Sequence, residues 1–247
     1  MSAVGLLIPT VSSPAAPGPQ DPAVAPPEFI DLASLDTGIA LDIRYAGRDN
    51  FVGRPLAGYE AGLCLLTREA AHALAAVQQE AAALGYGLLV YDAYRPARAV
   101  AHIERWAADP DDQDTKAEYY PNLDKSRLFH DGYIHARSGH SRGGTVDVTL
   151  VHPCGTPVDM GTGFDCFDTR SHTLDPRTTG PRRAHRLLLK SAMERAGFVN
   201  LPEEWWHFTH RSEPYPDTYF DFPVARSSLA RPGALAGGGP ALLQSAA

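Results

Sequence analysis

The chain has 247 residues, enough for one sizeable domain or two small ones. Hydrophobic residues make up 44% and charged residues 21%, the proportions of a soluble globular protein, so wholesale disorder is excluded. With 22 Lys and Arg against 29 Asp and Glu, the net charge of −7 argues against a nucleic-acid binder, which needs a basic surface.

Apolar runs and cysteines exclude two further classes. No apolar run approaches the roughly 20 residues that span a bilayer, so we expect no membrane span. The three cysteines, Cys64, Cys154 and Cys166, lack CxxC spacing and form neither a disulfide framework nor a cysteine zinc site. Because there are ten histidines, the ligands of any bound metal should be His and carboxylate side chains.

Both ends of the chain have low complexity. Residues 1–27 hold seven of the 21 prolines, which predicts a flexible arm, and residues 225–247 predict a similarly flexible tail. The apolar run at residues 4–8 is short and follows no Lys or Arg, so we expect a cytoplasmic protein, with export to the periplasm or outside as the alternative. One folded domain over residues 28–224 follows, and nothing in it indicates an oligomeric state.

The first predicted elements of the domain are a helix, a strand and a second helix. Residues 67–84 are rich in alanine, Thr67 can cap this first helix and Gly85 ends it. The apolar run over residues 87–91 predicts a buried strand, and an Arg-Pro pair then begins a helix over residues 95–108.

The second half mixes helix and strand. Residues 109–136 are polar and irregular, which indicates a long surface excursion. Strands are predicted at 145–150 and 205–209, with a basic amphipathic helix at 184–196 between them. Because no βα alternation repeats, we predict an α+β fold, with a central and mainly antiparallel sheet flanked by helices.

A Gly/Ser-rich turn holds the first candidate site residue, His140, and Asp147 lies on the strand that follows. Glycines allow the backbone to fold back tightly, so the imidazole and the carboxylate can converge. A surface loop is the alternative for His140 alone. An Asp within an apolar strand is stronger evidence for a site, because a buried carboxylate must be paired or bind a metal.

The second candidate, His207, lies among aromatic residues on the last predicted strand, where the alternative is a hydrogen-bonded core histidine. Glu204, three residues earlier, would face the opposite side of a regular strand. Joint action of the two side chains therefore requires a turn before the strand, which Pro202 favours.

Together these residues make a set that suits catalytic zinc. His140, Asp147 and His207 would supply three ligands and leave a fourth position for water. Zinc lowers the pKa of such a water from 15.7 to about 7, and Glu204 would take its proton as general base. Arg95, at the end of a buried strand, could stabilise an oxyanion; the alternative is an ordinary salt bridge with Asp92.

Six segments in this order resemble the VanX-type D-alanyl-D-alanine dipeptidases. They are AspIleArgTyrAla (42–46), AsnPheValGly (50–53), AspAlaTyrArgPro (92–96), SerGlyHisSerArgGlyGlyThrValAsp (138–147), GluTrpTrpHisPhe (204–208) and GluProTyrProAspThrTyrPheAspPhePro (213–223). The similarity covers residues 28–224, and each segment alone is weak whereas the conjunction is specific. The arm, the tail and residues 172–182 depart from the family pattern.

The resemblance implies a catalytic domain that hydrolyses D-Ala-D-Ala to two D-Ala with one zinc ion per chain. Such an activity serves control of peptidoglycan precursors, glycopeptide resistance or recycling of the cell wall. The implied site residues are the zinc ligands His140, Asp147 and His207, the general base Glu204, the transition-state stabiliser Arg95, and Asp165 and Ser138 as holders of the substrate ammonium group. A buried carboxylate such as Asp165 can bind an ammonium by a charge-assisted hydrogen bond.

Two alternative functions would use the same three metal ligands. One is a zinc DD- or LD-carboxypeptidase or endopeptidase on longer peptidoglycan peptides, which should lack the acidic clamp at Asp165. The other is a non-catalytic, zinc-stabilised binding module like the hedgehog signalling domain, in which Glu204 and Arg95 would be dispensable. Four aromatic residues, which core packing would equally explain, are available to wall a small cleft: Phe164, Trp205, Trp206 and Phe208.

Overall fold

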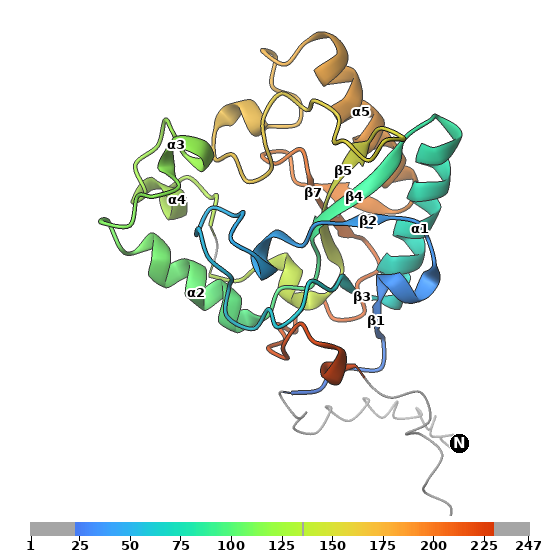
Figure 1. Ribbon diagram of the computed structural model, residues 1–247, viewed down its shortest axis with the longest axis horizontal. Coiled ribbons are helices and arrows are strands. Elements are labelled where there is room, and N and C mark those ends of the chain that lie inside the picture. The colour runs from blue at the N-terminus through green and yellow to red at the C-terminus, as the bar shows by residue number, and fades with distance from the viewer. Residues whose placement is uncertain (1–22, 135, 230–247) are drawn as a thin grey trace, which may run out of the picture.

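The structure is a computed structural model that describes residues 23–134 and 136–229 (Figure 1). Its helices and strands are β1 (Phe29–Asp31), β2 (Ala40–Leu41), β3 (Leu65–Thr67), α1 (Arg68–Ala83), β4 (Gly87–Asp92), α2 (Ala97–Ala107), α3 (Lys116–Tyr119), α4 (Arg127–His130), β5 (Thr145–Val151), α5 (Gly180–Arg195), β6 (Phe198–Asn200) and β7 (His207–His210). The 3₁₀ turn η3 (Gly139–Arg142) precedes β5. The predicted α+β class is confirmed.

The central sheet has five strands in the order β2-β4-β5-β7-β6. Strands β4, β5, β7 and β6 pair antiparallel, whereas β2 runs parallel to β4, so the sheet is mainly antiparallel as predicted. β1 and β3 form a separate antiparallel pair. A bulge in β4 between Val90 and Asp92 shifts the register so that Asp92 lies opposite Asp147 of β5.

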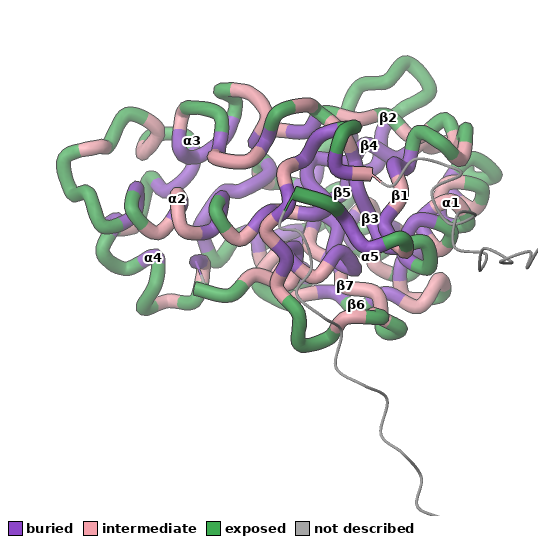
Figure 2. Tube along the Cα trace, turned by 90° about the horizontal axis from the view of Figure 1, so that it is seen from below, coloured by how far each residue is buried: buried purple, intermediate pink, exposed green. Residues whose placement is uncertain are grey.

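Helices lie to both sides of this sheet (Figure 1). α1 and α5 pack against each other, α1 also against β4 and α5 against β5 and β6, while α2, α3 and α4 lie on the other side. All seven residues of β5 are buried, and Figure 2 shows this strand inside a shell of exposed loops. Successive residues of a strand face opposite sides, so Thr145, Asp147 and Thr149 share one face with Val151, and Val146, Val148 and Leu150 share the other.

Most predicted elements occur with shifted boundaries. Thr67 sits at the start of α1, but its hydroxyl has no hydrogen-bond partner, so the predicted side-chain cap is wrong. α5 begins at Gly180, four residues before the predicted start, because Pro181 suits the first turn of a helix. The last strand begins at His207 and not at Trp205.

The predicted surface excursion over residues 109–136 is wrong in one respect. It contains α3 and α4, and Tyr120 and Leu128 are fully buried. Lys125 is 2% exposed, donates hydrogen bonds to the carbonyls of Asp109 and Asp112, and packs over the Trp106 ring. The segment therefore forms a packed wall and not a loose loop.

The two ends of the described chain meet. The amide of Ala25 donates a 2.7 Å hydrogen bond to the carbonyl of Ser228, and both residues are buried, so ordered structure passes both predicted boundaries of the domain. The rest of the predicted arm and tail lies outside the described residues. Cys64, Cys154 and Cys166 are not disulfide-bonded. No helix within the described ranges has the length and apolar character to cross a membrane.

Gly143, directly after η3, has a φ of +83°, and a Cβ there would lie 2.3 Å from the Phe29 ring. We expect Gly143→Ala to lower the free energy of unfolding by about 2–4 kcal/mol, through backbone strain and overlap together. Gly155 is the matched control, because its φ is +85° and a Cβ there would meet nothing within 4 Å. Gly155→Ala should cost only about 1 kcal/mol. Urea unfolding measures both, and equal losses would contradict the role of Phe29.

Candidate active site

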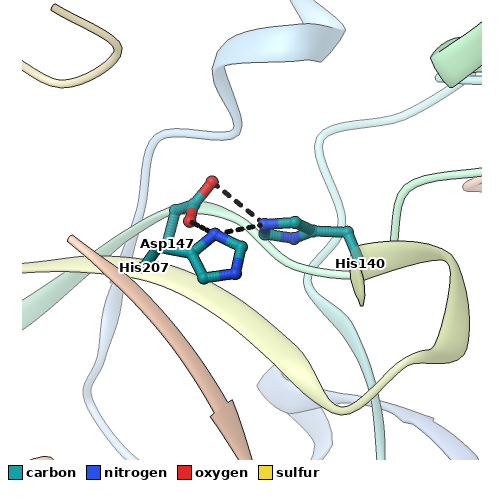
Figure 3. Close-up of side chains that lie close together, drawn as sticks. All are labelled: His140, Asp147 and His207. Atoms are coloured by element: carbon teal, nitrogen blue, oxygen red, sulfur yellow. Dashed lines mark hydrogen bonds and ion pairs between the residues drawn. The ribbon is translucent and has the colours of Figure 1, made fainter. Parts of the chain in front are cut away.

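Three neighbouring elements bring His140, Asp147 and His207 together. His140 lies in η3, Asp147 on β5 and His207 directly opposite it on β7. One ligand atom from each residue lies within 4.8 Å of the others. Figure 3 shows the three side chains pointing at one another from these elements. The predicted convergence of the three residues is thus present in the geometry.

The donor atoms of this cluster suit a cation. His140 Nδ1 lies 2.7 Å from the carbonyl oxygen of Ala93, which can only accept, so the Nδ1 hydrogen is donated there. The Nε2 of a neutral His140 then carries a lone pair, and it faces Asp147 Oδ2 at 3.3 Å and His207 Nδ1 at 3.3 Å. Asp147 Oδ1 is buried and lies 3.2 Å from His207 Nδ1, but it accepts no hydrogen bond with suitable geometry. A divalent cation would satisfy these facing lone pairs, and a backbone carbonyl that orients a ligand histidine is usual at metal sites.

Charge neighbours set the state of Asp147. Burial alone would raise its pKa, but the imidazoles of His140 and His207 outweigh burial and lower it. The carboxylate is therefore ionised and available as a ligand. Burial also disfavours the charged form of His207 and so lowers its pKa, but the neighbouring Asp147 and Glu204 raise the pKa overall.

Glu204 lies in a turn before β7, as its proposed joint action with His207 requires. The amide of Glu204 donates to the carbonyl of Leu201, and the amide of His207 donates to the carbonyl of Glu204. This turn places Glu204 Oε2 3.4 Å from His207 Nδ1. Burial raises the pKa of Glu204 to about 7, although His207 lowers it. A carboxyl group with a pKa near neutrality can both accept and return a proton.

Arg95 makes the salt bridge with Asp92 and also reaches the cluster. Its Nε and Nη2 both lie 2.9 Å from Asp92 Oδ2, and its Nη2 lies 3.6 Å from Asp147 Oδ2. Asp92 is fully buried and also accepts a 2.6 Å hydrogen bond from the hydroxyl of Tyr59. The two interpretations of Arg95 are thus compatible, because Asp92 fixes a guanidinium that still faces the cluster.

Asp165 lies on the loop after β5 with a φ of +57°, unusual for a residue other than glycine. It is buried and accepts a 2.8 Å hydrogen bond from the hydroxyl of Tyr45. Burial and the nearby charge of Asp147 raise the pKa of Asp165, against a smaller lowering by Arg95. A cation placed beside Asp165 would favour its charged form. Sequence reasoning missed Tyr45, although it lies in the quoted segment 42–46.

A cavity of about 260 Å³ joins these residues. Among the residues that line it are all seven predicted site residues: Arg95, Ser138, His140, Asp147, Asp165, Glu204 and His207. The Ser138 hydroxyl accepts a 3.3 Å hydrogen bond from the amide of His140, so it also caps η3.

The expected aromatic walls are wrong. None of the four predicted aromatic residues lines this cavity; the aromatic residues that do are Tyr45, Phe51, Tyr133 and Phe167. Strand alternation explains the error for β7, because His207 faces the cavity and Phe208 must then face the core. Phe164 instead stacks on Tyr91 at 4.7 Å and meets Trp206 edge-on.

Two imidazoles and one carboxylate with an adjacent glutamate form the arrangement of a metal-dependent hydrolase. The family model described as D-ala-D-ala dipeptidase matches residues 26–225. The chain belongs to this family of metallopeptidases, which confirms the resemblance seen in its motifs.

Several relatives cover most of the chain. D-alanyl-D-alanine dipeptidase of Enterococcus faecalis is 45% identical over 198 residues, which are 80% of this chain and 98% of the relative. The dipeptidase of Streptomyces coelicolor is 45% identical over 199 residues, again 80% and 98%. That of Escherichia coli is 36% identical over 73% of this chain and 83% of its own. A solved VanY D,D-pentapeptidase with Zn(II) is 15% identical, with a TM-score of 0.38 over 63% of this chain and 77% of its own.

Proposed function

We propose that this protein is a zinc-dependent dipeptidase that hydrolyses D-Ala-D-Ala to two D-Ala, with one zinc ion per chain. The observation that carries the proposal is the buried His140–Asp147–His207 cluster, beside Glu204 in one small cavity. Membership of the D-ala-D-ala dipeptidase family supports the substrate. Zinc suits two imidazoles and one carboxylate that leave a coordination position open.

The chain's own residues divide the chemistry. When bound, zinc acts as a Lewis acid and makes water acidic enough to attack a carbonyl at neutral pH. Glu204 takes the proton of the attacking water and delivers it to the leaving amine. Arg95, fixed by Asp92, donates hydrogen bonds to the carbonyl oxygen as negative charge develops on it.

The cavity favours a short substrate with a free amino terminus. Its volume of about 260 Å³ lies below the roughly 300–1,000 Å³ of common ligand pockets. Asp165 is a buried carboxylate that pairs with no cationic side chain within salt-bridge distance in the described chain, so a substrate ammonium group can pair with it. Ser138 lines the same cavity and is proposed to assist in holding the ammonium group.

The two alternatives explain this site less well. A carboxypeptidase or endopeptidase on longer peptides would have to place an uncharged chain beside the buried carboxylate of Asp165. A zinc-stabilised binding module needs neither a glutamate 3.4 Å from a ligand histidine nor a guanidinium directed at the cluster.

Replacement of His140, Asp147 or His207 by Ala should abolish both zinc binding and activity, because two remaining ligands hold zinc poorly. Metal analysis of the purified variants measures the zinc content. Thermal unfolding should also show lower stability, since the ion ties η3 to β5 and β7. A His207→Ala variant with one full equivalent of zinc would remove His207 from the ligand set.

Glu204→Ala should retain zinc and lose most of its turnover. A positioned general base typically contributes about 10²–10⁴-fold to the rate. The measurement is kcat on D-Ala-D-Ala beside zinc content, and Glu203→Ala is the matched control because Glu203 is exposed on the same turn. Near wild-type kcat in Glu204→Ala would assign the base elsewhere and favour the binding module.

N-acetyl-D-Ala-D-Ala should be a poor substrate. Acetylation removes the ammonium charge, and a charge-assisted hydrogen bond of about 1.5–3 kcal/mol corresponds to about 10–100-fold in kcat/KM. Asp165→Asn should reduce the ratio of kcat/KM for the free dipeptide to kcat/KM for the acetylated one, mainly by lowering kcat/KM for the free dipeptide. Equal losses on both compounds would show that Asp165 only orders its loop. Efficient release of D-Ala from the acetylated compound or from a pentapeptide would favour the carboxypeptidase.

A further inference from the structure

One end of the cavity is lined by hydrogen-bond donors that the proposed chemistry does not use. Arg142, at the end of η3, and Thr209, on β7, both line it. Thr209 lies opposite Thr145 in the β5–β7 ladder, and their hydroxyl oxygens are 2.9 Å apart. One hydroxyl of this pair donates to the other, so the accepting hydroxyl keeps its own proton for a further partner.

Arg142 is fixed in place and not a mobile surface side chain. Its Nε lies 2.8 Å from Glu213 Oε2, and its side chain is 19% exposed. Gly144 makes this pairing sterically feasible, because a Cβ there would lie 2.5 Å from the Glu213 side chain. In the described chain Glu213 is the one carboxylate that pairs with Arg142. The guanidinium also packs against the Tyr219 ring, with its carbon 5.8 Å from the ring centroid. Since the contact with Glu213 uses Nε, the planar guanidinium keeps Nη donors for a second anion.

Gly139 lets the donors approach the cavity. A Cβ on Gly139 would lie 2.9 Å from Thr145 Oγ1, 3.4 Å from Arg142 Nη2 and 3.7 Å from Thr209 Oγ1. The three donor groups therefore gather around Gly139, and a side chain there would collide with Thr145 Oγ1. Gly139 itself lines the cavity.

This donor end lies on the other side of the metal cluster from Asp165. Along β5, the side chains of Thr145, Asp147 and Thr149 share one face. Asp165 accepts a hydrogen bond from Tyr45, over whose ring Arg95 packs, and Arg95 is held by Asp92 of β4. Thr209 lies on β7, the other neighbour of β5, and pairs with Thr145. Asp165 and the donor end therefore approach the cluster from opposite neighbours of β5.

We propose that Arg142 and Thr209 bind the C-terminal carboxylate of the dipeptide. This assignment rests on the proposed dipeptidase function and adds the second charged end of the substrate to it. The carboxylate is the one anionic group of a zwitterionic dipeptide. The proposed chemistry gives Arg142 and Thr209 no other contact with the substrate.

The spacing of the strands fits this assignment. The Thr145–Thr209 pair lies two residues from the Asp147–His207 pair, which is about 6.5–7 Å along the strands. In the substrate, one residue of about 3.3–3.6 Å and one hydrogen bond of about 3 Å separate the scissile carbonyl from a carboxylate partner. Charged groups at both ends of the cavity would therefore measure the length of the substrate and exclude chains extended in either direction.

The test compares D-Ala-D-Ala with D-alanyl-D-alaninamide, which keeps the ammonium group and the scissile bond but has no carboxylate. Wild-type protein should prefer the acid by about 10–100-fold in kcat/KM, the size of a lost charge-assisted contact. The double variant Arg142→Gln/Glu213→Gln removes both charges together, so neither is left buried alone. Its preference for the acid should fall to within about threefold of unity.

Arg137→Gln is the matched control, because Arg137 lines the same cavity and packs over the same Tyr219 ring as Arg142, but is exposed and forms no ion pair in the described chain. This control should keep the wild-type preference. Thr209→Val leaves the Arg142–Glu213 pair intact and should lower the preference several-fold, so it serves as a second test if the double variant fails to fold. Thermal unfolding reports the folding of each variant.

Each outcome decides the assignment. A wild-type protein that cleaves the amide as well as the acid would overturn the carboxylate subsite and leave the dipeptidase standing. Loss of the preference in Arg137→Gln, or its retention in both Thr209→Val and a folded double variant, would also overturn the subsite. A wild-type protein that cleaves neither compound would overturn the proposed function, and the subsite with it.

Discussion

The alignment of Asp92, Asp147 and His207 across three neighbouring strands is the constraint on which the site depends. Antiparallel pairing sets Asp147 opposite His207, and the bulge in β4 sets Asp92 opposite Asp147. Three polar side chains thus stand in one row across a buried sheet. Their burial is costly unless each finds a partner. Arg95 and Tyr59 are partners of Asp92, and a cation held by the cluster would be the partner of Asp147 and His207.

A further set of contacts holds the side chains that line the cavity in orientation. The carbonyl of Ala93 fixes the ring of His140, Asp92 fixes Arg95, and Tyr45 fixes Asp165. Such supporting contacts set the tautomer and direction of a ligand, and they commonly matter nearly as much as the ligands. Arg95 also packs over the Tyr45 ring at 4.6 Å, so the residue that supports Asp165 contacts Arg95 as well. These cavity-lining groups are therefore positioned as one connected unit.

Local chemistry made part of this site predictable from sequence. A glycine-rich turn before a strand placed His140 near Asp147, and Pro202 favoured the turn that brings Glu204 to His207. The supporting contacts were not predictable in the same way, because Tyr59 and Asp92 are 33 residues apart and Tyr45 and Asp165 are 120 apart. Such pairs depend on how the whole chain packs. The predicted lining by Phe208 was wrong because hydrophobicity alone does not tell which face of β7 is buried.

The hydrogen bond between Ala25 and Ser228 nearly closes the described chain into a ring. Termini that lie side by side are a common condition for circular permutation, since a short linker can join them without disturbing the core. Here the joined ends would leave η3, β5 and β7 uncut. The order of the elements along the chain can then change while the geometry of the cluster stays the same. New termini would be opened at an exposed turn such as the one around Gly155.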